Sequence, residues 1–480
     1  MNELWFDPAR VAIGGDWAAT DRTLPVVDPS TGETVAQIAR GTANEVDAAV
    51  RAAQTALDGP WGALDATDRG RLLTRLGRLV EDRAEVLARI EAQDVGKPLK
   101  QARADALALA RYLEFYGGAA DKLMGETIPY RPGYTVYTLR EPHGVTAHIV
   151  PWNYPMQIIG RSVGAALAMG NACVIKPAEE ASLTALAFVR LAQEAGFPTG
   201  AINIVPGLGE EAGAALSAHP GVQHISFTGS VPVGSLIQAA AARNVVPVTL
   251  ELGGKSPQLV FEDADLDAAL PFLVNAGLQN AGQTCSAASR ILVARRRYDQ
   301  VVDRMAARYR AVSVGPALSD PDVGPLISAR QREVVQSYLD RAADLTLAAE
   351  GRIAADAPAG GHYLAPRLLS GVTADHLLAR EEIFGPVQVV IPFDDEDEAV
   401  AIANGTDFAL VAAVWTDSGA RQMRLAKRLR GGQVFLNTYG AGGGVELPFG
   451  GVGKSGHGRE KGFEALYGFS TLKTVAAHHG

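Results

Sequence analysis

From residue 144 onward the chain repeats one pattern: a short apolar run, a turn rich in glycine or proline, and then a helical segment. The run VTAHIV is followed by PWNYP, NACVIK by a helical stretch that begins PAEEAS, and HISF by TGSVPVG. Strands that alternate with helices in this way form a parallel sheet covered by helices on both faces. The pattern therefore predicts an α/β fold, with a second α/β stretch from about residue 254 to 450.

Two further regions depart from this alternation. Residues 44–118 carry apolar side chains at helical spacing until Gly96 and Pro98 interrupt them, and we interpret that apolar stripe as core packing. Residues 128–142 are rich in tyrosine around a Pro-Gly turn, which predicts an exposed two-stranded element. Such an element has unpaired edges that a partner subunit could cover.

Composition restricts the class of protein and its partners. Apolar residues make up 47% of the chain and charged residues 20%, which is typical of a globular protein with a large core. A net charge of −9 without a basic cluster argues against a nucleic-acid partner. The first residues lack the features of a signal peptide, and no apolar run is long enough to span a membrane. We therefore expect a cytoplasmic protein without a membrane partner.

The two cysteines give no disulfide framework, and the dispersed histidines form no metal motif, so no metal is expected. Cys173 lies in the apolar run ACVI and is interpreted as a buried structural residue. Cys285 lies among small and polar residues in a predicted loop, where a thiolate can attack a carbonyl. A lone cysteine is nevertheless more often structural than reactive.

A glycine-rich dinucleotide fingerprint follows the predicted strand AINIV, where Gly207, Gly209 and Ala212 fit G-x-G-x-x-G/A. An ordinary site of this type needs an acidic residue about 20 positions later to bind the ribose. No Asp or Glu occurs between Glu211 and Glu251, so the fingerprint is incomplete. A plain glycine-rich turn is the alternative.

A second candidate for an anion site opens with Thr228, Gly229 and Ser230 after the run HISF. These residues begin a predicted helix with Gly234 in its first turns, and glycine there lets a pyrophosphate approach the helix N-terminus. A capped helix start explains the same residues equally well.

Other polar residues stand at the ends of predicted strands. Glu251 ends the strand VPVTL and suits either a general base or a salt bridge. Asn153, in Pro-Trp-Asn-Tyr-Pro, suits either an oxyanion donor or a turn. Lys176 and Glu179 follow a buried strand and suit either ribose hydroxyls or an ordinary helix start.

Together these motifs and their order resemble the aldehyde dehydrogenase superfamily. The resemblance extends from about residue 8 to 475 and is highly specific. The matching blocks are PWNYP (151–155), KPAE (176–179), FTGS (227–230), LELGGKSP (250–257), GQTCSA (282–287), EEIFGPV (381–387), Asn437, PFGG (448–451) and KSGHGRE (454–460).

The resemblance implies a domain organisation. A Rossmann-type cofactor-binding domain would comprise residues 1–119 and 143–253, and an α/β catalytic domain residues 254–450. Residues 120–142 and 463–480 would form a β-type oligomerisation arm, which implies a homodimer or a homotetramer.

The resemblance also implies catalytic roles in the oxidation of an aldehyde to a carboxylic acid. Cys285 would attack the aldehyde carbon, with Asn153 and the backbone N–H of Cys285 as the oxyanion hole. The thiohemiacetal would give hydride to NAD, and Glu251 would activate the water that hydrolyses the resulting thioester.

Several further residues would line the cofactor site. Glu179 would accept bonds from a ribose 2′-OH and would repel a 2′-phosphate, which favours NAD over NADP. The residues implied to bind NAD are Trp152, Lys176, Glu179, Gly209, Gly229, Ser230, Gly234, Glu382 and Phe384.

The segment Gly160-Arg161-Ser162-Val163 departs from the family pattern, because Ser162 stands where many members have a second conserved lysine linked to proton relay. The Arg-Ser pair is similar to benzaldehyde-type and vanillin-type dehydrogenases. Arg161 is also similar to succinic-semialdehyde enzymes, but Gln279 occupies the place of their second arginine. We therefore expect an aromatic or medium-length aldehyde, with Arg161 as a substrate contact or simply a salt-bridge partner.

Two alternatives belong to other classes of function. A CoA-acylating semialdehyde dehydrogenase would pass the thioester to coenzyme A, but such relatives typically lack a glutamate at position 251. A non-catalytic binding protein on the same fold would be favoured by loss of Cys285 or Glu251, and both residues are present.

Overall fold

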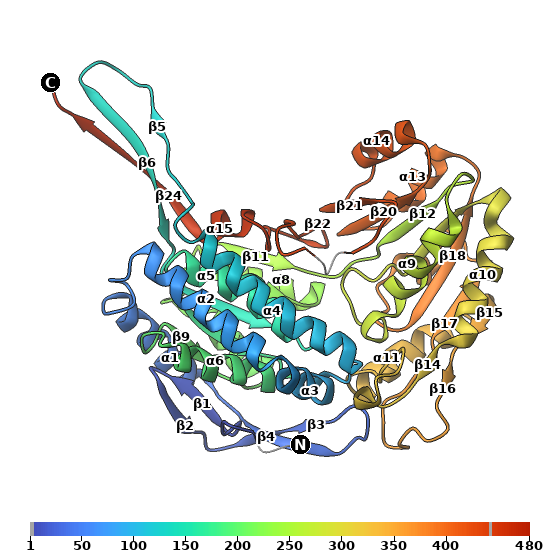
Figure 1. The fold of residues 1–480 in the computed structure, drawn as a ribbon, viewed down its shortest axis with the longest axis horizontal. Coiled ribbons are helices and arrows are strands. Elements are labelled where there is room, and N and C mark those ends of the chain that lie inside the picture. The colour runs from blue at the N-terminus through green and yellow to red at the C-terminus, as the bar shows by residue number, and fades with distance from the viewer. Residues whose placement is uncertain (1–3, 441–443) are drawn as a thin grey trace.

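Two large lobes lie side by side, and a narrow arm projects from one of them (Figure 1). This computed structural model describes residues 4–440 and 444–480. Residues 1–3 and 441–443, which fall within the predicted ranges 1–119 and 254–450, lie outside the described residues. Each lobe has its own apolar core and its own largely parallel sheet, so the predicted α/β fold is confirmed.

The first lobe is built on an eight-stranded sheet with the order β2-β1-β9-β8-β7-β10-β11-β23. The run from β9 to β11 is parallel, whereas β1, β2 and β23 pair antiparallel. The parallel strands are almost completely buried, which explains their continuous apolar sequences. The strands are β1 (Arg10–Ile13), β2 (Asp16–Ala19), β7 (Val145–Val150), β8 (Ala172–Pro177), β9 (Ile202–Ile204), β10 (His224–Thr228), β11 (Val248–Glu251) and β23 (Gly456–His457).

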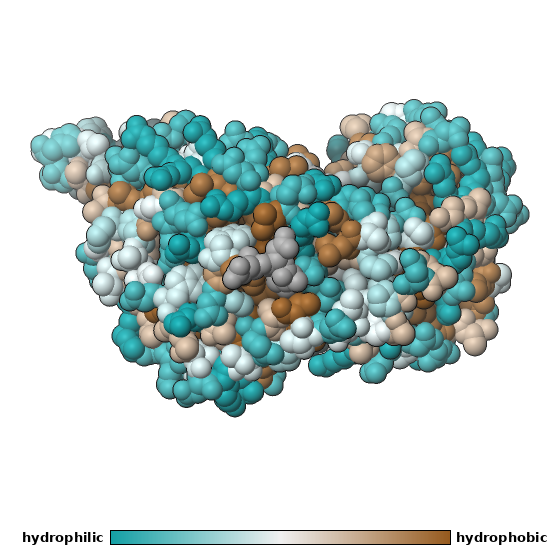
Figure 2. All heavy atoms as spheres, turned by 60° about the horizontal axis from the view of Figure 1, so that its bottom comes forward, coloured by the Kyte–Doolittle hydropathy of each residue, from teal (hydrophilic) through white to brown (hydrophobic). Residues whose placement is uncertain are grey.

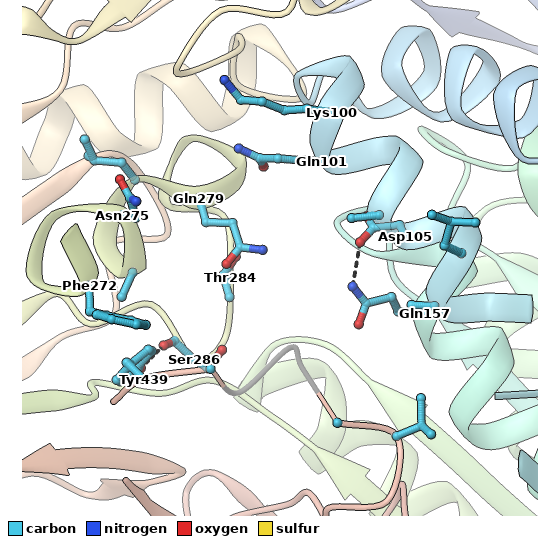
Figure 3. Close-up of a pocket in the computed structure, with 18 of the residues that line it drawn as sticks. Lys100, Gln101, Asp105, Gln157, Phe272, Asn275, Gln279, Thr284, Ser286 and Tyr439 are labelled. Carbon is cyan, nitrogen blue, oxygen red and sulfur yellow. Dashed lines mark hydrogen bonds between the residues drawn. The ribbon is translucent and has the colours of Figure 1, made fainter. Parts of the chain in front are cut away.

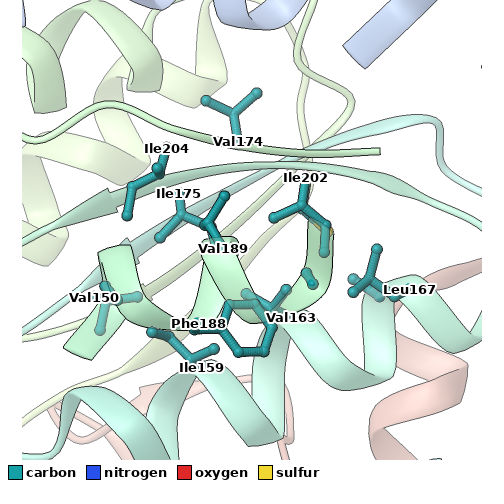
Figure 4. Packing of buried hydrophobic residues seen from close by; sticks show 14 of the residues in the cluster. Val150, Ile159, Val163, Leu167, Val174, Ile175, Phe188, Val189, Ile202 and Ile204 are labelled. Carbon is teal, nitrogen blue, oxygen red and sulfur yellow. The ribbon is translucent and has the colours of Figure 1, made fainter. Parts of the chain in front are cut away.

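Helices α5 (Pro155–Ala168) and α6 (Leu183–Ala195) pack on this sheet (Figure 4). Ile159 and Val163 of α5 lie beside Phe188 of α6 and against the strands that carry Ile175 and Ile204. A second layer of helices contacts α5 and α6 from outside, which matches the apolar stripe expected over residues 44–118. The remaining helices of this lobe are α1 (Ala43–Leu57), α2 (Ala66–Asp82), α3 (Ala84–Val95), α4 (Leu99–Ala119), α7 (Ala214–Ser217) and α8 (Val231–Ala242).

The second lobe holds a seven-stranded sheet with the order β15-β17-β18-β13-β12-β20-β21, parallel except for β15. Side chains of Asp265, Ser328, Asp395 and Ser418 accept backbone N–H groups and so begin four of its helices. The strands are β12 (Pro257–Val260), β13 (Arg290–Ala294), β15 (Thr346–Glu350), β17 (Arg367–Ser370), β18 (Val387–Phe393), β20 (Val411–Trp415) and β21 (Gln433–Leu436). The main helices are α9 (Leu266–Leu278), α10 (Tyr298–Ala311), α11 (Ala329–Asp340), α13 (Glu396–Asn404) and α14 (Gly419–Arg428).

The arm is a three-stranded antiparallel sheet of β5 (Thr127–Ile128), β6 (Tyr134–Pro142) and β24 (Ser470–His478). Strand β24 pairs with β6 along its whole length, so the predicted hairpin gains a C-terminal strand as expected. The range 463–480 assigned to the arm also includes the short helix α15 (Glu464–Gly468), which precedes β24.

The segment that follows residue 450 joins the two lobes. Strand β22 (Val452–Gly453) pairs with β19 (Phe408–Ala409) beside the second sheet, and β23 then pairs with β11 of the first sheet. An isolated bridge joins Phe449 to Glu460 within this segment. The same stretch of chain thus reaches the carboxyl end of β11, where Glu251 lies.

The face of the molecule in Figure 2 is mostly hydrophilic, with hydrophobic residues in small separate groups. Within residues 4–440 and 444–480, every helix is too short or too polar to span a membrane.

Candidate active site

Cys285 lies in the loop between the 3₁₀ helix η2 (Gln279–Gly282) and β13. The backbone just before it is left-handed at Asn280, Ala281 and Gly282, with φ of 49°, 55° and 73°. Such conformations are costly for residues other than glycine, and they gather at functional sites. Cys285 is half-buried in the wall of a small cavity of about 50 Å³.

Glycine and asparagine residues hold this loop in place. A Cβ on Gly254 would lie 2.3 Å from the carbonyl oxygen of Cys285, so only glycine fits there. The Nδ2 atom of Asn153 donates to the Gln283 carbonyl at 3.1 Å, and Nδ2 of Asn280 donates to the Asn153 carbonyl at 3.1 Å. Asn153 therefore lies in the wall of the Cys285 cavity. No acceptor among the described residues takes its second amide hydrogen.

Glu251 ends β11 and is 1% exposed. Neither of its carboxylate oxygens has a hydrogen-bond partner among the described residues. Burial raises the pKa of Glu251 well above its usual range, and the nearby charge of Arg161 opposes that rise. A Cβ on Gly450 would lie 2.7 Å from Oε1 of Glu251, so a glycine leaves room for this carboxyl group.

Burial raises the pKa of the Cys285 thiol to about 12, while the Arg161 guanidinium lowers it and Glu382 and Glu251 raise it further. The thiol is therefore protonated at neutral pH in this arrangement, and attack on a carbonyl requires a base. Cys173, by contrast, is completely buried in β8, as expected for a structural cysteine.

The residues expected to bind the adenosine ribose lie at the carboxyl end of β8. Lys176, the residue before the last in that strand, is almost completely buried, and its Nζ forms an ion pair of 2.9 Å with the half-buried Glu179. Gly213 lies close to this lysine, since a Cβ there would be 4.0 Å from Cδ of Lys176. The pair presents one cation and one carboxylate at a strand end, which is where α/β sheets bind their ligands.

Two aromatic residues and a carboxylate form the next group. The rings of Trp152 and Phe384 meet edge to face, with centroids 5.4 Å apart. Glu382 accepts a hydrogen bond of 2.9 Å from the backbone N–H of Gly254. Burial raises the pKa of Glu382 to about 7, against the opposing effects of that bond and of Lys255. The Gly254 backbone thus connects Glu382 to the Cys285 loop.

Ser230 precedes α8 in extended conformation, but its side chain makes no capping hydrogen bond to the helix. Thr228 accepts a bond from Arg161 instead of capping α8. The capped-helix alternative for these residues is therefore not observed. A Cβ on Gly229 would clash with the Phe227 ring at 2.4 Å, and one on Gly234 would lie 2.6 Å from Leu252.

The glycine-rich fingerprint does not open a regular helix. Gly209 begins a five-residue π-helix, and a four-residue α-helix follows it. Gly209 itself is exposed, and a Cβ there would meet nothing within 4 Å. Glu211 is held by a two-point bond with Arg40. The segment therefore lacks the long helix of an ordinary dinucleotide site.

Arg161 of α5 lines the Cys285 cavity, but its guanidinium is already paired. Its Nε lies 2.5 Å from Oε2 of Glu460, and its Nη2 donates to Thr228 at 3.2 Å. The guanidinium also lies over the Phe449 ring, 5.0 Å from the centroid. These contacts are those of a salt-bridge partner, which is one of the two roles expected for Arg161. Ser162 donates its hydroxyl hydrogen to the carbonyl of Ile158, one turn earlier in α5.

The family model for aldehyde dehydrogenases matches residues 17–475 of this chain. The chain belongs to the aldehyde dehydrogenase family. It is similar to a hydroxyisobutyraldehyde dehydrogenase from Mycolicibacterium austroafricanum, with 42% identity over 98% of this chain and 93% of that relative.

Solved structures of aldehyde dehydrogenases have the same fold. A protein from Burkholderia cenocepacia, described only provisionally as an aldehyde dehydrogenase, is 64% identical with a TM-score of 0.98 over 98% of this chain and all of its own. An aldehyde dehydrogenase from Bacillus cereus, solved as an NAD⁺ complex, is 37% identical with a TM-score of 0.96 over 99% of this chain and 97% of that one.

A larger cavity of about 1070 Å³ lies outside the Cys285 cavity (Figure 3). Its walls come from α4, α5, α9 and the Cys285 loop, so both lobes of this aldehyde dehydrogenase contribute. Sequence reasoning did not identify most of these residues, because they carry no local motif and come together only through packing of the lobes.

Sequence reasoning also missed the role of Glu460, although it lies in the matching block KSGHGRE. A further cavity of about 680 Å³ brings Ser230 and Glu382 together with Arg380 and Lys454. Lys454 lies in the matching block KSGHGRE, whereas Arg380 lies outside the matching blocks. Among the described residues, no group of three or more His, Cys, Asp or Glu side chains is arranged to hold a metal ion.

Proposed function

We propose that this aldehyde dehydrogenase oxidises an aldehyde to a carboxylic acid, with NAD as acceptor and a covalent thioester on Cys285. One observation carries the proposal: the half-buried Cys285 and the amide of Asn153 line the same small cavity. A nucleophile beside an uncommitted N–H donor is the arrangement that acyl chemistry requires.

The residues present fit NAD. Lys176 and Glu179 present a cation and a carboxylate for ribose hydroxyls, and the paired rings of Trp152 and Phe384 offer a surface for a flat heterocycle. Glu382, held by Gly254, offers a second carboxylate for the other ribose. Gly209, Gly229, Ser230 and Gly234 complete the proposed cofactor site. When bound, NAD supplies the two-electron acceptor that oxidation of an aldehyde requires.

The chain's own residues account for the remaining chemistry. The Cys285 thiol first loses its proton to solvent water, and the thiolate sulfur then bonds to the aldehyde carbon. The oxygen that gains charge is held by the Asn153 amide and the Cys285 backbone N–H. Each such donor contributes about 3 kcal/mol in comparable sites. The charge of Arg161 lowers the pKa of the Cys285 thiol and so favours the attacking thiolate.

Glu251 acts after oxidation, when the thioester must be hydrolysed. In its ionised form, Glu251 takes a proton from water, the resulting hydroxide adds to the thioester carbon, and the C–S bond breaks to release the acid and the thiolate. A glutamate at position 251 favours hydrolysis of the thioester. Transfer of the acyl group to coenzyme A is the alternative. Adding coenzyme A and assaying for acyl-CoA distinguishes the two.

The carboxylate of Glu179 supports NAD over NADP, because it would repel a 2′-phosphate. We propose that residues 1–119 and 143–253 bind the cofactor and that residues 254–450 supply Cys285. Residues 120–142 and 463–480 would form the arm through which a homodimer or homotetramer assembles in the cytoplasm.

The test is NADH formation by the wild type and by Cys285→Ala, across aliphatic, aromatic and semialdehyde substrates. Loss of activity in Cys285→Ala, with NAD binding retained, supports the thioester route. Cys173→Ala is the matched control, because it removes the other thiol and should leave the reaction in place. Turnover of no aldehyde by the wild type, or full activity of Cys285→Ala, would overturn the proposal and favour a binding protein.

A further inference from the structure

The Cys285 cavity and the larger outer cavity meet at a neck with uniform chemistry. Among the described residues, the side chains that line both cavities are all polar and uncharged, and they are Gln157, Gln279, Thr284 and Ser286. These residues lie where an aldehyde in the outer cavity approaches Cys285. Apolar substrate pockets are lined mainly by aliphatic and aromatic side chains, and this neck is not.

The orientation of Gln157 is fixed by its partner. Its Nε2 donates to Oδ1 of Asp105 at 2.5 Å, and the other Asp105 oxygen forms an ion pair with the buried Lys97. A carboxylate only accepts hydrogen bonds, so the amide nitrogen must face Asp105 and the amide oxygen must face away. Figure 3 shows the oxygen of Gln157 turned away from Asp105. Gln157 therefore offers an acceptor to the neck.

The buried charges behind Gln157 make this orientation rigid. Lys97 is completely buried and also forms an ion pair of 2.8 Å with Glu91. Its Nζ lies over the Tyr154 ring, 4.0 Å from the centroid, and the Tyr154 hydroxyl bonds Thr284 at 2.9 Å. One buried cation thus fixes two walls of the neck, Gln157 through Asp105 and Thr284 through Tyr154.

Gln279 supplies the opposite wall. Its side chain is exposed and makes no hydrogen bond to the described residues, and Figure 3 shows its amide directed into the space between the helices. The Ser286 hydroxyl likewise has no partner among the described residues, although its carbonyl accepts from Tyr439. The neck therefore combines an oriented acceptor with an uncommitted amide and an uncommitted hydroxyl.

We infer that this neck selects aldehydes that carry a neutral hydroxyl group away from the aldehyde carbon. A hydroxyl donates one hydrogen bond and accepts others, so it can donate to Gln157 Oε1 while it accepts from the Gln279 amide. The inference rests on the proposed function and names the substrate class of the same site. Among the aldehydes expected from sequence, it favours a medium-length hydroxyaldehyde over an aromatic one.

The charge of the neck supports a neutral ligand. None of its four side chains carries a formal charge. The cations Arg161 and Lys461 line the inner cavity outside the neck, and Arg161 is paired with Glu460. A methyl group at the same place would leave the oriented Gln157 oxygen without a donor. Sites built to hydrogen-bond a hydroxyl discriminate strongly against analogues that lack it, because their polar groups are left unpaired.

The wild-type enzyme tests this with substrates that exchange a methyl for a hydroxyl. We expect kcat/KM for 3-hydroxypropanal to exceed that for butanal by about tenfold or more. Equal values, or a preference for butanal, would overturn the inference and leave the proposed function intact. If neither substrate nor any other aldehyde is oxidised, the proposed function itself fails.

Gln157→Met and Gln279→Met remove the amides at nearly constant volume. Each is expected to lower kcat/KM for 3-hydroxypropanal about fivefold while keeping that for butanal, so the ratio falls. Asn275→Leu, which lines the outer cavity but not the neck, is the control and should keep the wild-type ratio. NAD affinity verifies folding of each variant. An unchanged ratio in both methionine variants, with NAD affinity intact, would overturn the inference.

Discussion

Arg161 and Glu460 form a buried ion pair beside the Cys285 cavity, with 2.5 Å between Nε and Oε2. Arg161 comes from α5, whereas Glu460 follows β23, so the pair fastens the segment that joins the lobes to the first sheet. Glu460 also accepts a bond of 2.6 Å from Ser226 on β10. In the segment that departs from the family pattern, Ser162 bonds within α5. The charged contact made by this segment is therefore the ion pair of Arg161 with Glu460.

Replacing one partner of this ion pair should destabilise the protein more than replacing both partners. Arg161→Met leaves the Glu460 carboxylate buried and uncompensated, which we expect to lower the free energy of unfolding by about 3 to 5 kcal/mol. The double variant with Glu460→Met restores an apolar contact and should lie closer to the wild type. Urea unfolding of the wild type, both single variants and the double variant measures the coupling. If the losses of unfolding free energy in the two single variants add up to the loss in the double variant, the two residues are not coupled and the prediction is wrong.

The raised pKa of Glu251 predicts a pH-dependent stability. At pH values between the Glu251 pKa of the unfolded chain and the higher Glu251 pKa of the folded protein, the folded protein keeps a proton that the unfolded chain has lost. The free energy of unfolding therefore falls as the pH rises through this range. Glu251→Gln removes this loss. The difference in unfolding midpoint, variant minus wild type, should therefore grow from pH 5 to pH 8. Glu262→Gln, on the exposed surface, is the control and should show no such trend.

The same substitution should affect turnover. Without the Glu251 carboxylate the proposed hydrolysis of the thioester lacks its base, so we expect kcat to fall by about 10² or more. Rapid-quench measurement should still find one burst of NADH per active site, because attack and oxidation precede hydrolysis. A variant that loses the burst as well would place Glu251 in an earlier step.

Short sequence patterns correctly predicted the helices and strands whose formation depends on neighbouring residues in the chain. The apolar runs of β7, β8 and β10 and the helical spacing of residues 44–118 correspond to observed strands and helices, since burial on a sheet or helix face has a fixed period. The fingerprint at Gly209, which the sequence already showed to be incomplete, is followed by no regular helix. Its spacing fits a dinucleotide turn, but the turns that follow are too short and irregular to form that helix.

The contacts between distant segments could not be predicted in this way. Glu460 reaches Arg161 only because β23 pairs with β11, and no periodicity in either segment indicates that pairing. The neck likewise joins Gln157 of α5 to Gln279 and Ser286 of the other lobe. Such sites depend on how two lobes pack, which is information that neither sequence segment contains alone.

Cofactor choice should depend on Glu179. Glu179→Gln removes the charge that would oppose a 2′-phosphate, and we expect the ratio of NADP to NAD affinity to rise about tenfold. Fluorescence titration with both cofactors measures this. Glu180→Gln removes a charge from the next residue and should change the ratio much less. Equal effects of the two variants would mean that overall charge, and not the position of Glu179, sets the preference.

The arm exposes large apolar side chains that a second subunit could cover. Tyr137 and Leu139 of β6 and Leu472 of β24 are 38%, 40% and 55% exposed. If the arm mediates assembly, a charge placed on it would have to be buried in the interface, which is unfavourable. The double variant Tyr137→Asp and Leu472→Asp should therefore form smaller species than the wild type, as measured by sedimentation velocity. Met423→Asp, on α14 and 57% exposed, is the matched control and should sediment like the wild type. A double arm variant that sediments unchanged would remove the arm from the interface.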